Sequence, residues 1–445
     1  MTNALLDPAT DPATDPSPPA AGVRGAVRSA WRRSASDPVL AVLDQGLVSG
    51  TRFVTTVAVG RAAGEEELGL YSLAMAGLIL AGVAQEAVVT KPYTVLREGE
   101  VDSDYAGSAL LHHAALGGGL AVALLAAAGI AAAAGAGTAA IVLAVTAAAV
   151  PLSLLWEFAR RMSFAHLRLR SALAVDGGLA ALQLGALAGL WATGRLTALT
   201  ALAATAAAGL IAGSIWLARS RTVFRLGTGR VGADWRRSWQ FGRWVLAAQL
   251  CGQVNGSAPQ WVLAAAVGIA ATGRFAAAQN VVLLCNPLIL AVASLLVAQT
   301  AAARRTGGPT AVRRVAVRAA VALTAFAGLF WLGLLVAAGP LLGLLYGTEF
   351  ASAAPVILLL GLAPLAWSVS TAFEAGLSAI DRPEVGFRAM LAGLLTTVAA
   401  AVPLSAIYAA PGAGAAVLLG SAVAAVALAV PFLRLTSASP APEPA

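Results

Sequence analysis

The sequence predicts an all-α polytopic membrane protein with about twelve transmembrane helices, arranged in two six-helix repeat bundles. Three observations support this prediction. Hydrophobic residues make up 59% of the 445-residue chain and charged residues only 11%, whereas a soluble protein carries roughly 25% charged residues. Apolar stretches of ~20 residues, the length of a helix that crosses a bilayer, recur along the whole chain. Related polar and glycine positions also return after 204 residues.

The twelve apolar stretches define the predicted membrane spans. They lie at 38–60, 68–90, 109–134, 138–157, 171–193, 196–217, 243–266, 272–297, 317–339, 353–376, 386–408 and 412–433. The first six form the expected N-terminal bundle, 38–217, and the last six the expected C-terminal bundle, 241–433.

The remaining segments are polar. Residues 1–37 repeat Asp-Pro-Ala-Thr, and residues 434–445 are also rich in proline and small residues. Such segments cannot bury enough apolar surface to offset chain entropy, so both are expected to be disordered tails. Residues 218–240 are rich in arginine and tryptophan. They are expected to form an interfacial cytoplasmic linker between the bundles.

The basic residues predict the orientation of the chain. They cluster before the first span and in alternate loops thereafter: Arg24 to Arg33; Lys91 and Arg97; Arg160, Arg161, Arg168 and Arg170; Arg219 to Arg243; Arg304 to Arg318; Arg382 and Arg388; and Arg434. The intervening loops hold Arg61, Arg195 and Arg274. This positive-inside bias predicts that both termini lie in the cytoplasm. The expected location of the protein is the inner or plasma membrane of the cell. The net charge of +8 is therefore attributed to topology, and no nucleic-acid partner is expected.

A polar stripe runs along one face of the first apolar helix. It comprises Gln45, Ser49, Arg52 and Thr56, at steps of four, three and four residues, which place the side chains on one helix face. The same stripe returns 204 residues later as Gln249, Gln253, Gly256 and Gln260. Polar side chains are costly in hydrocarbon, so each stripe should face protein or a water-filled cavity. Two such stripes predict a cavity between two bundles, as in a transporter.

Glycines repeat with the same offset. Gly64 and Gly69 correspond to Gly268 and Gly273. Each pair is expected in the tight outer turn between the first two helices of its half, where a positive φ or a close backbone approach requires glycine. Because six helices separate the copies, both halves have the same orientation, and parallel repeats of this kind suit alternating access by rocking.

Four segments carry a resemblance to a known family. They are Asp44-Gln45-Gly46 with Gly64 and Gly69-Leu70-Tyr71; Trp156-Glu157-Phe158-Ala159-Arg160-Arg161 with its continuation to Asp176; Leu345 to Phe350; and Pro411 to Ala416. In this order they resemble the polysaccharide and lipid-linked oligosaccharide flippases of the multidrug/oligosaccharidyl-lipid/polysaccharide exporter superfamily. The resemblance covers about residues 38 to 433, and Pro259-Gln260 in the seventh helix departs from it. It implies two bundles in a V that move a polyprenyl-(di)phosphate-linked saccharide from the inner to the outer leaflet for cell-surface polysaccharide assembly.

Arg52 is the sharpest candidate for substrate binding. It lies only ~4–5 Å from the midpoint of its span at 1.5 Å per residue. A guanidinium there can hold a diphosphate with two hydrogen bonds; alternatively, it snorkels outward or pairs with a neighbouring acid. The other cavity candidates are Gln45, Ser49, Thr56, Gln249, Gln253, Asn255 and Gln260. Their groups can bind sugar hydroxyls or, alternatively, hydrogen-bond between helices.

Three acids are candidates for coupling or gating. Asp44 and Glu86 could take up protons, or could pair with Arg52 or Lys91. Glu374 lies well inside its apolar span and is expected to face a cavity or accept hydrogen bonds. Asp176 is expected to pair with Arg168 or Arg170.

Other function classes are less consistent with the sequence. The predicted outer loops are short and poor in Asp, Glu and His, and no cofactor, metal site or catalytic motif stands out, so no enzyme is expected. A drug or small-metabolite antiporter of the same superfamily is the alternative transporter. A scaffold for cell-wall assembly is a third class, which the intramembrane charges disfavour. The expected partners are the lipid-linked saccharide, membrane lipids and a coupling ion (H⁺ or Na⁺), with the protein as a monomer that could meet glycan-assembly proteins.

Overall fold

The computed structural model describes residues 20–98, 102–227 and 229–437, and within these ranges the regular structure is helical, without strands. The N-terminal half contains α1 (Ala20–Gln85), a π-helical turn (Glu86–Thr90), α2 (Lys91–Leu96), α3 (Ser103–Ala133), α4 (Gly137–Ala165), α5 (Leu169–Ala192), α6 (Ala198–Arg219) and a 3₁₀ turn (Arg221–Val223). The C-terminal half contains α7 (Val231–Ala266), α8 (Ile269–Val282), α9 (Asn286–Tyr346), α10 (Ala354–Leu360), α11 (Ala363–Ala379) and α12 (Pro383–Ser437). Further 3₁₀ turns cover Leu283–Cys285 and Thr348–Ala353.

Three of these helices turn back on themselves. Non-helical residues divide α1 at Gly64, α9 at Gly307–Gly308 and α12 at Ala409. With these arms counted separately, α8 joined to the first arm of α9, and α10 joined to α11, the described residues form twelve long helical segments. Before this division, eight helices of the described residues are long and apolar enough to cross a membrane, and α7 is not among them. The predicted all-α polytopic fold is confirmed, and the protein is a multi-pass membrane protein.

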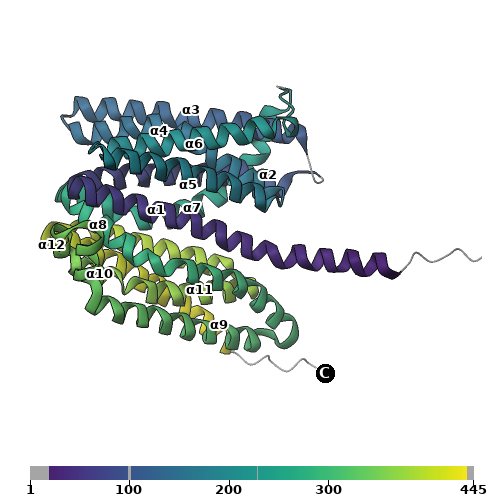
Figure 1. Ribbon diagram of the computed structural model, residues 1–445. Coiled ribbons are helices and arrows are strands. Elements are labelled where there is room, and N and C mark those ends of the chain that lie inside the picture. The colour runs from purple at the N-terminus through teal and green to yellow at the C-terminus, as the bar shows by residue number, and fades with distance from the viewer. Residues whose placement is uncertain (1–19, 99–101, 228, 438–445) are drawn as a thin grey trace, which may run out of the picture.

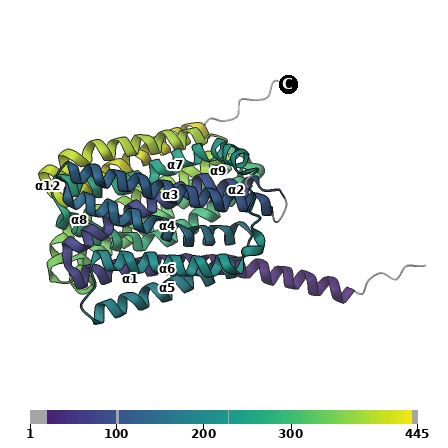
Figure 2. The ribbon, with the colours of Figure 1, turned by 90° about the horizontal axis from the view of Figure 1, so that it is seen from above.

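The buried cores show how the two bundles meet. One core joins both bundles: Val59 and Tyr71 of α1 belong to the same cluster as Phe275 of α8 and Tyr346 of α9. The core around Phe432 of α12 is confined to the C-terminal bundle, whereas the core around Phe158 of α4 also packs against Val245 and Leu246 of α7. The bundles therefore share a core at one end, here called the joined end, and at the other end α7 links the C-terminal half to the N-terminal bundle. Figures 1 and 2 show α8 and the bend of α12 at the joined end, with α1 projecting from the opposite one, and Figure 1 also shows α10 at the joined end.

The predicted glycine repeat has a direct structural counterpart at the joined end. Gly64 has a φ of 85° and Gly268 a φ of 130°, a region that L side chains rarely adopt. A Cβ atom on Gly69 would collide with the carbonyl oxygen of Ile269, and one on Gly273 would collide with the carbonyl oxygen of Glu65. Gly273 corresponds to Gly69 and Ile269 to Glu65 under the offset of 204 residues, so the two contacts are equivalent. An approximate two-fold axis therefore relates the two halves at this crossing. The prediction of positive φ and close backbone approach is confirmed.

The N-terminal boundary differs from the prediction. α1 begins at Ala20, so residues 20–37 are helical instead of part of a disordered tail. Alanines and arginines in this stretch are strong helix formers and extend the first membrane helix. The expected tail residues 1–19 lie outside the described residues. At the other end α12 continues to Ser437, so only 438–445 of the expected C-terminal tail fall outside the described part.

The predicted linker 218–240 is also shorter in the structure. α6 ends at Arg219 and α7 begins at Val231. The first turns of α7 are buried against α3, because the Ser108 hydroxyl donates to Asp234 at 2.6 Å and Tyr105 bonds Ser238 at 2.8 Å. These polar pairs fix residues 231–240 to the N-terminal bundle. An interfacial cytoplasmic position of this segment stays a prediction.

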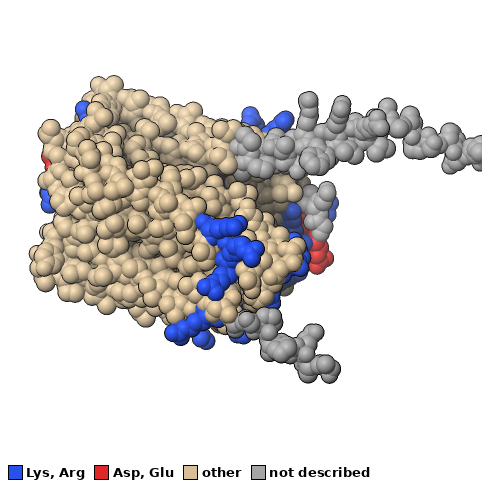
Figure 3. Space-filling model, turned by 90° about the horizontal axis from the view of Figure 1, so that it is seen from below, with Lys and Arg blue, Asp and Glu red and all other residues tan. Residues whose placement is uncertain are grey.

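The surface charge is uneven along the molecule. On the face that Figure 3 shows, lysine and arginine gather toward the end at which Figure 1 marks the C-terminus, and most of the remaining surface is uncharged. This distribution suits a protein that crosses a bilayer with one basic end. That this end lies in the cytoplasm stays a prediction.

Candidate substrate cavity and charged network

A cavity of about 190 Å³ lies inside the N-terminal bundle, bordered by both arms of α1 and by α4, α5 and α6. Its polar lining comprises Thr51, Arg52, Tyr71, Glu86, Ser153, Trp156, Glu157, Arg161, Asp176, Gln183 and Thr205. Sites for drug-sized ligands measure roughly 300–1,000 Å³. This cavity is therefore sized for one polar group of a larger ligand, or for a small ion with its water.

A buried ion-pair triad borders the cavity. Arg160 of α4 is 8% exposed and donates from Nε to Asp176 of α5 at 2.7 Å and from a terminal nitrogen to Asp44 of α1 at 2.9 Å. The Trp156 indole donates to the second oxygen of Asp176 at 2.7 Å. The other oxygen of Asp44 is buried without a hydrogen-bond partner among the described residues. The triad thus ties three helices together and leaves one acceptor open.

A second triad lies beside the first. Arg161 donates to Glu157, one turn earlier on α4, at 2.7 Å and pairs with Glu86 at 2.8 Å. Glu86 opens the π-helical turn that follows α1. Glu157 lies 4.0 Å from Arg160, which links the two triads. Four carboxylates and two guanidiniums therefore form one network, with a formal charge of −2 when all are ionised.

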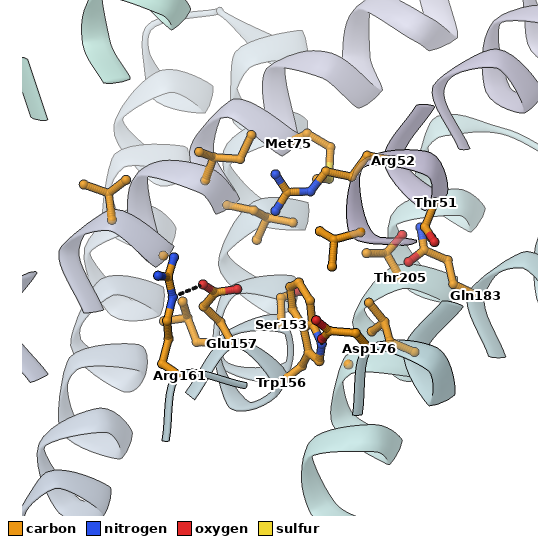
Figure 4. Close-up of a pocket in the computed structure, with 18 of the residues that line it drawn as sticks. Thr51, Arg52, Met75, Ser153, Trp156, Glu157, Arg161, Asp176, Gln183 and Thr205 are labelled. Carbon is orange, nitrogen blue, oxygen red and sulfur yellow. Dashed lines mark hydrogen bonds and ion pairs between the residues drawn. The ribbon is translucent and has the colours of Figure 1, made fainter. Parts of the chain in front are cut away.

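Arg52 stands apart from this network. It is exposed, and its guanidinium has no hydrogen bond or ion pair with any described residue. Figure 4 shows it projecting into the cavity from α1, across from Glu157 and Asp176. A guanidinium at this depth is costly to keep in an apolar setting without a partner. The geometry leaves its donors free for an anionic group that enters the cavity.

The structure corrects three predicted pairings. Arg160 and Arg161 were assigned to a basic loop, but α4 continues to Ala165 and carries both inside the bundle. They, and not Arg52 or Lys91, are the partners of Asp44 and Glu86. Asp176 pairs with Arg160 instead of Arg168 or Arg170, because its side chain faces α4 while those two arginines are exposed at the start of α5.

Helix α1 presents two polar stripes. Gln45, Ser49, Arg52 and Thr56 keep an exposed or half-buried face, with Gln45 donating to Ser49 at 3.3 Å and the Thr56 hydroxyl to the Arg52 carbonyl at 2.9 Å. The neighbouring stripe Asp44, Val48, Thr51 and Thr55 is buried against the N-terminal bundle. Of the predicted stripe, Arg52 lines the cavity. Substrate contact by Gln45, Ser49 and Thr56 stays a prediction.

The predicted lining of the second half is not part of this cavity. Gln260 is 7% exposed and hydrogen-bonds Gln279 of α8, and Gln253 donates to Ser257 at 3.1 Å. The amide oxygens of Gln249 and Asn255 are buried without partners in the described part of the chain. Gln260 therefore bonds between helices, whereas Gln249 and Asn255 retain unused acceptors. Their contact with substrate stays a prediction.

The three predicted coupling acids do not lie together. Asp44 and Glu86 belong to the network, whereas Glu374 is exposed on α11, beside Gly386 of α12, and has no hydrogen bond or ion pair with a described residue. It faces neither the N-terminal cavity nor a basic partner. A coupling role for any of the three stays a prediction.

Sequence reasoning missed Glu157, Gln183 and the functional position of the two α4 arginines. Gln183 donates to Thr55 at 2.9 Å beside the cavity. The spacing of Glu157, Arg160 and Arg161, at three and four residues, fits a helical ion-pair pattern. Phe158, Met162 and Ala165 continue the apolar positions at helical spacing beyond the predicted span, and this spacing is the signal that the charges lie within a helix.

Comparisons with known proteins agree with the fold. No family model matches the sequence, and no curated protein matches it in sequence. Among solved structures, an inward-facing multidrug resistance MATE family transporter of the MOP superfamily superposes with a TM-score of 0.74 at 15% identity, covering 87% of this chain and 94% of that one. An outward-facing MATE structure with 14% identity gives 0.62, covering 90% and 94%. Lipid II flippase MurJ, in an inward closed conformation, gives 0.68 at 11% identity, covering 89% and 87%.

These neighbours define the class of fold. The chain has the same overall fold as the inward-facing MATE family transporter and as lipid II flippase MurJ.

Proposed function

We propose that this protein transports a polyprenyl-(di)phosphate-linked saccharide from the inner to the outer leaflet by alternating access. The observation that carries the proposal is the unpaired guanidinium of Arg52 inside a cavity of a membrane-spanning helix bundle. Guanidinium groups bind phosphate oxygens with two parallel hydrogen bonds. The resemblance in fold to a lipid II flippase supports a lipid-linked substrate.

The size of the cavity shapes the mechanism. At about 190 Å³ it accepts a phosphate or one sugar, and not a whole lipid-linked saccharide. We infer that the phosphate binds at Arg52, the saccharide extends between the bundles toward Gln249 and Asn255, and the polyprenyl chain remains in the bilayer. Separation at the joined end and closure at the other then expose the site to the outer side.

The charged network supplies a route for coupling in this proposal. Asp44 has an open carboxylate oxygen, and it shares Arg160 with Asp176. Uptake of a proton or another small cation by this excess of carboxylates would weaken the ties between α1, α4 and α5. The basic residues at the end opposite the joined end support a cytoplasmic location of both termini in this proposal.

One observation favours a second candidate, a drug or small-metabolite antiporter of the same superfamily. Even with Arg52 included, the charged groups at the cavity sum to a formal −1, since four carboxylates face three guanidiniums. A cationic substrate would neutralise this charge. The MATE neighbours, described as multidrug resistance transporters, agree with this candidate as well.

A leaflet assay distinguishes the candidates. Cells depleted of the protein are probed with an impermeant glycosidase for lipid-linked saccharides on each face of the membrane. The flippase proposal predicts accumulation on the cytoplasmic face, rescued by the wild type and by Arg195→Ala but not by Arg52→Ala. Arg195 is an exposed arginine outside the cavity. Unchanged leaflet distribution together with greater sensitivity to cationic toxic compounds would favour the antiporter.

A further inference from the structure

A π-helical turn interrupts the chain at the edge of the cavity. It covers Glu86–Thr90, between α1 and α2, and the Lys91 backbone N–H donates to the carbonyl of Glu86, five residues earlier. The residues on either side of the turn have α-helical backbone angles. Such a turn holds one residue more than an α-helical turn, and single π turns inside α-helices occur frequently at functional sites. The element is therefore a candidate for a change of helical register.

The start of this turn is connected to the cavity and to two other helices. Glu86 lines the cavity and pairs with Arg161 of α4 at 2.8 Å. The preceding residue, Gln85, donates to the Leu154 carbonyl of α4 at 3.2 Å, and its amide oxygen accepts from His113 of α3 at 2.9 Å. Because Gln85 holds the end of α1 in place, the ion pair of Glu86 is the contact through which the cavity acts on the turn.

The other side of the turn touches the backbone of α7. A Cβ atom on Gly242 of α7 would lie 2.5 Å from the Ala87 carbonyl oxygen and 2.9 Å from Val88 Cα, so the two backbones are in direct contact. Further along α7, Gly252 lies beside Met390 of α12. The contact at Gly242 therefore lies near the place where α7 passes from the N-terminal bundle to the C-terminal one.

Thr90 shows that the π register leaves one hydrogen bond unmade. In α1 and α2 the other threonine hydroxyls each donate to the carbonyl four residues earlier, at 2.7–2.9 Å: Thr51, Thr55, Thr56 and Thr94. The Thr90 hydroxyl is buried and has no partner among the described residues. The carbonyl four residues before it is that of Glu86, which instead accepts from the backbone of Lys91. An α-helical register would give the Thr90 hydroxyl this acceptor, and a buried unpaired hydroxyl costs free energy.

We propose that the turn Glu86–Thr90 is a conformational switch that couples the cavity to α7. While Glu86 pairs with Arg161, the π register persists and the backbone at Ala87 contacts Gly242. When Glu86 is released, the turn becomes α-helical, the Thr90 hydroxyl gains its hydrogen bond, and α7 loses its contact with the turn. The C-terminal bundle then moves toward the N-terminal one at the end opposite the joined end.

The trigger of the switch rests on the proposed function, because an anionic group that enters the cavity competes with Glu86 for Arg161. Arg161 keeps its second partner, Glu157 (Figure 4), so the release of Glu86 does not leave a buried guanidinium unpaired.

The change of register is confined to a short segment. On return to the α register, the chain after Thr90 turns by ~100° and advances by ~1.5 Å. Only α2 follows directly; it has six residues and ends at Arg97, whose backbone is extended. The rotation breaks the contact between the Tyr93 hydroxyl and His166 Nε2, which are 3.0 Å apart. This contact opposes the change and keeps the π register as the resting state.

The distance between the bundles tests the switch without any substrate. Nitroxide labels are placed at Arg170 of α5 and Arg382, which precedes α12. Both residues are exposed and lie at the end opposite the joined end. The two native cysteines are replaced by alanine. Double electron–electron resonance of the purified full-length chain then gives the ratio of short to long distances.

Glu86→Gln should raise this ratio at least threefold. The control Glu98→Gln, which breaks an exposed pair with Arg237 at 3.8 Å, should leave it unchanged. Gly242→Ala separates the turn from α7 directly and should act like Glu86→Gln. It tests the same step if Glu86→Gln fails to fold.

The threonines test the change of register itself. Thr90→Val removes the hydroxyl that the α register would satisfy, so Glu86→Gln with Thr90→Val should return to the ratio of the parent chain. Glu86→Gln with Thr94→Val should not return to it, because the Thr94 hydroxyl is already bonded. Equal ratios in the parent chain, Glu86→Gln and Gly242→Ala, or equal ratios in the two double variants, would overturn the proposal. Because no substrate is present, these outcomes are separate from success or failure of the leaflet assay.

Discussion

The two halves of the molecule share their packing but not their chemistry. At the joined end their backbones are alike. Gly64 and Gly268 both have a positive φ, and Gly69 and Gly273 make equivalent close contacts with the backbone of the other half. Along the same helices, α1 carries Asp44 and borders a network of charges, whereas α7 carries amides. The constraint of a close helix crossing has thus kept both copies alike where the bundles meet.

This difference locates the chemistry of the protein. Charged groups inside a bundle are costly unless paired and hydrogen-bonded, and the described C-terminal helices have no network like that around Arg160. The N-terminal bundle retains four carboxylates and three guanidiniums around one cavity. We therefore propose that binding and coupling belong to the N-terminal bundle and that the C-terminal bundle acts mainly as its partner in rocking.

The largest expected effect comes from removing the centre of the network. Arg160→Ala leaves Asp44 and Asp176 buried without their shared cation, which should destabilise the protein by about 3–5 kcal/mol. Denaturant unfolding in detergent measures the change. Arg382→Ala, which breaks an exposed pair with Glu384, is the control and should cost at most about 1 kcal/mol. Equal losses of unfolding free energy in the two variants would contradict the claim that the buried charges of the N-terminal bundle contribute more to stability than an exposed ion pair does.

The reciprocal crossing predicts matched effects in the two halves. Gly69→Ala and Gly273→Ala each push a Cβ atom into backbone of the other bundle, so each should cost about 1–3 kcal/mol through overpacking. The control is Gly328→Ala, where a Cβ meets nothing within 4 Å and alanine favours the helix. Thermal unfolding of the three variants checks this expectation. A loss in only one of the two crossing variants would break the two-fold relation.

A smaller effect is expected from the ion pair between the bundles at the joined end. Glu65 accepts from Arg274 at 2.7 Å, and both side chains are partly exposed. A double-mutant cycle with Glu65→Gln and Arg274→Gln should give a coupling of about 0.2–1 kcal/mol. Because the pair bridges the bundles, its loss should also increase labelling of a cysteine introduced at the joined end. A coupling near zero with unchanged labelling would mean that the pair does not hold the bundles together.

The smallest predicted effect belongs to the second half. Gln260→Leu removes one interhelical bond to Gln279 and should cost about 0.6 kcal/mol, the average of such bonds in membranes. Unfolding measured beside Arg160→Ala provides the comparison. A cost as large as that of Arg160→Ala would show that the amides of the C-terminal bundle matter as much as the charges of the N-terminal one.

Much of the fold could be predicted because apolar length alone places membrane spans. The repeat was visible because glycine is required at Gly64, Gly69 and their counterparts, whatever surrounds them. Helix ends were less predictable, since alanine is only weakly apolar and also favours helix. This is why α1 begins at Ala20 and α4 extends beyond the predicted span to Ala165.

The candidate site was predicted only in part. Arg52 can be identified from the sequence because an arginine near the middle of a membrane helix costs free energy unless it has a partner or faces a cavity. The partners of Asp44 and Asp176 could not be read from one helix at a time, because Arg160 reaches both from a third helix. The location of the cavity within one bundle likewise depends on how α4, α5 and α6 pack, which residue periodicity does not specify.

The most direct test of the account is transport by the purified protein in liposomes. Flipping of a fluorescent polyprenyl-diphosphate sugar is measured for the wild type, Arg52→Ala and Arg195→Ala. Hydrogen bonds to charged groups contribute about 1.5–3 kcal/mol, so Arg52→Ala should slow flipping at least about tenfold. Its unfolding should stay unchanged, since Arg52 has no described partner, and Arg195→Ala should flip like the wild type. Wild-type flipping by Arg52→Ala would contradict the assignment of the phosphate site to the N-terminal cavity.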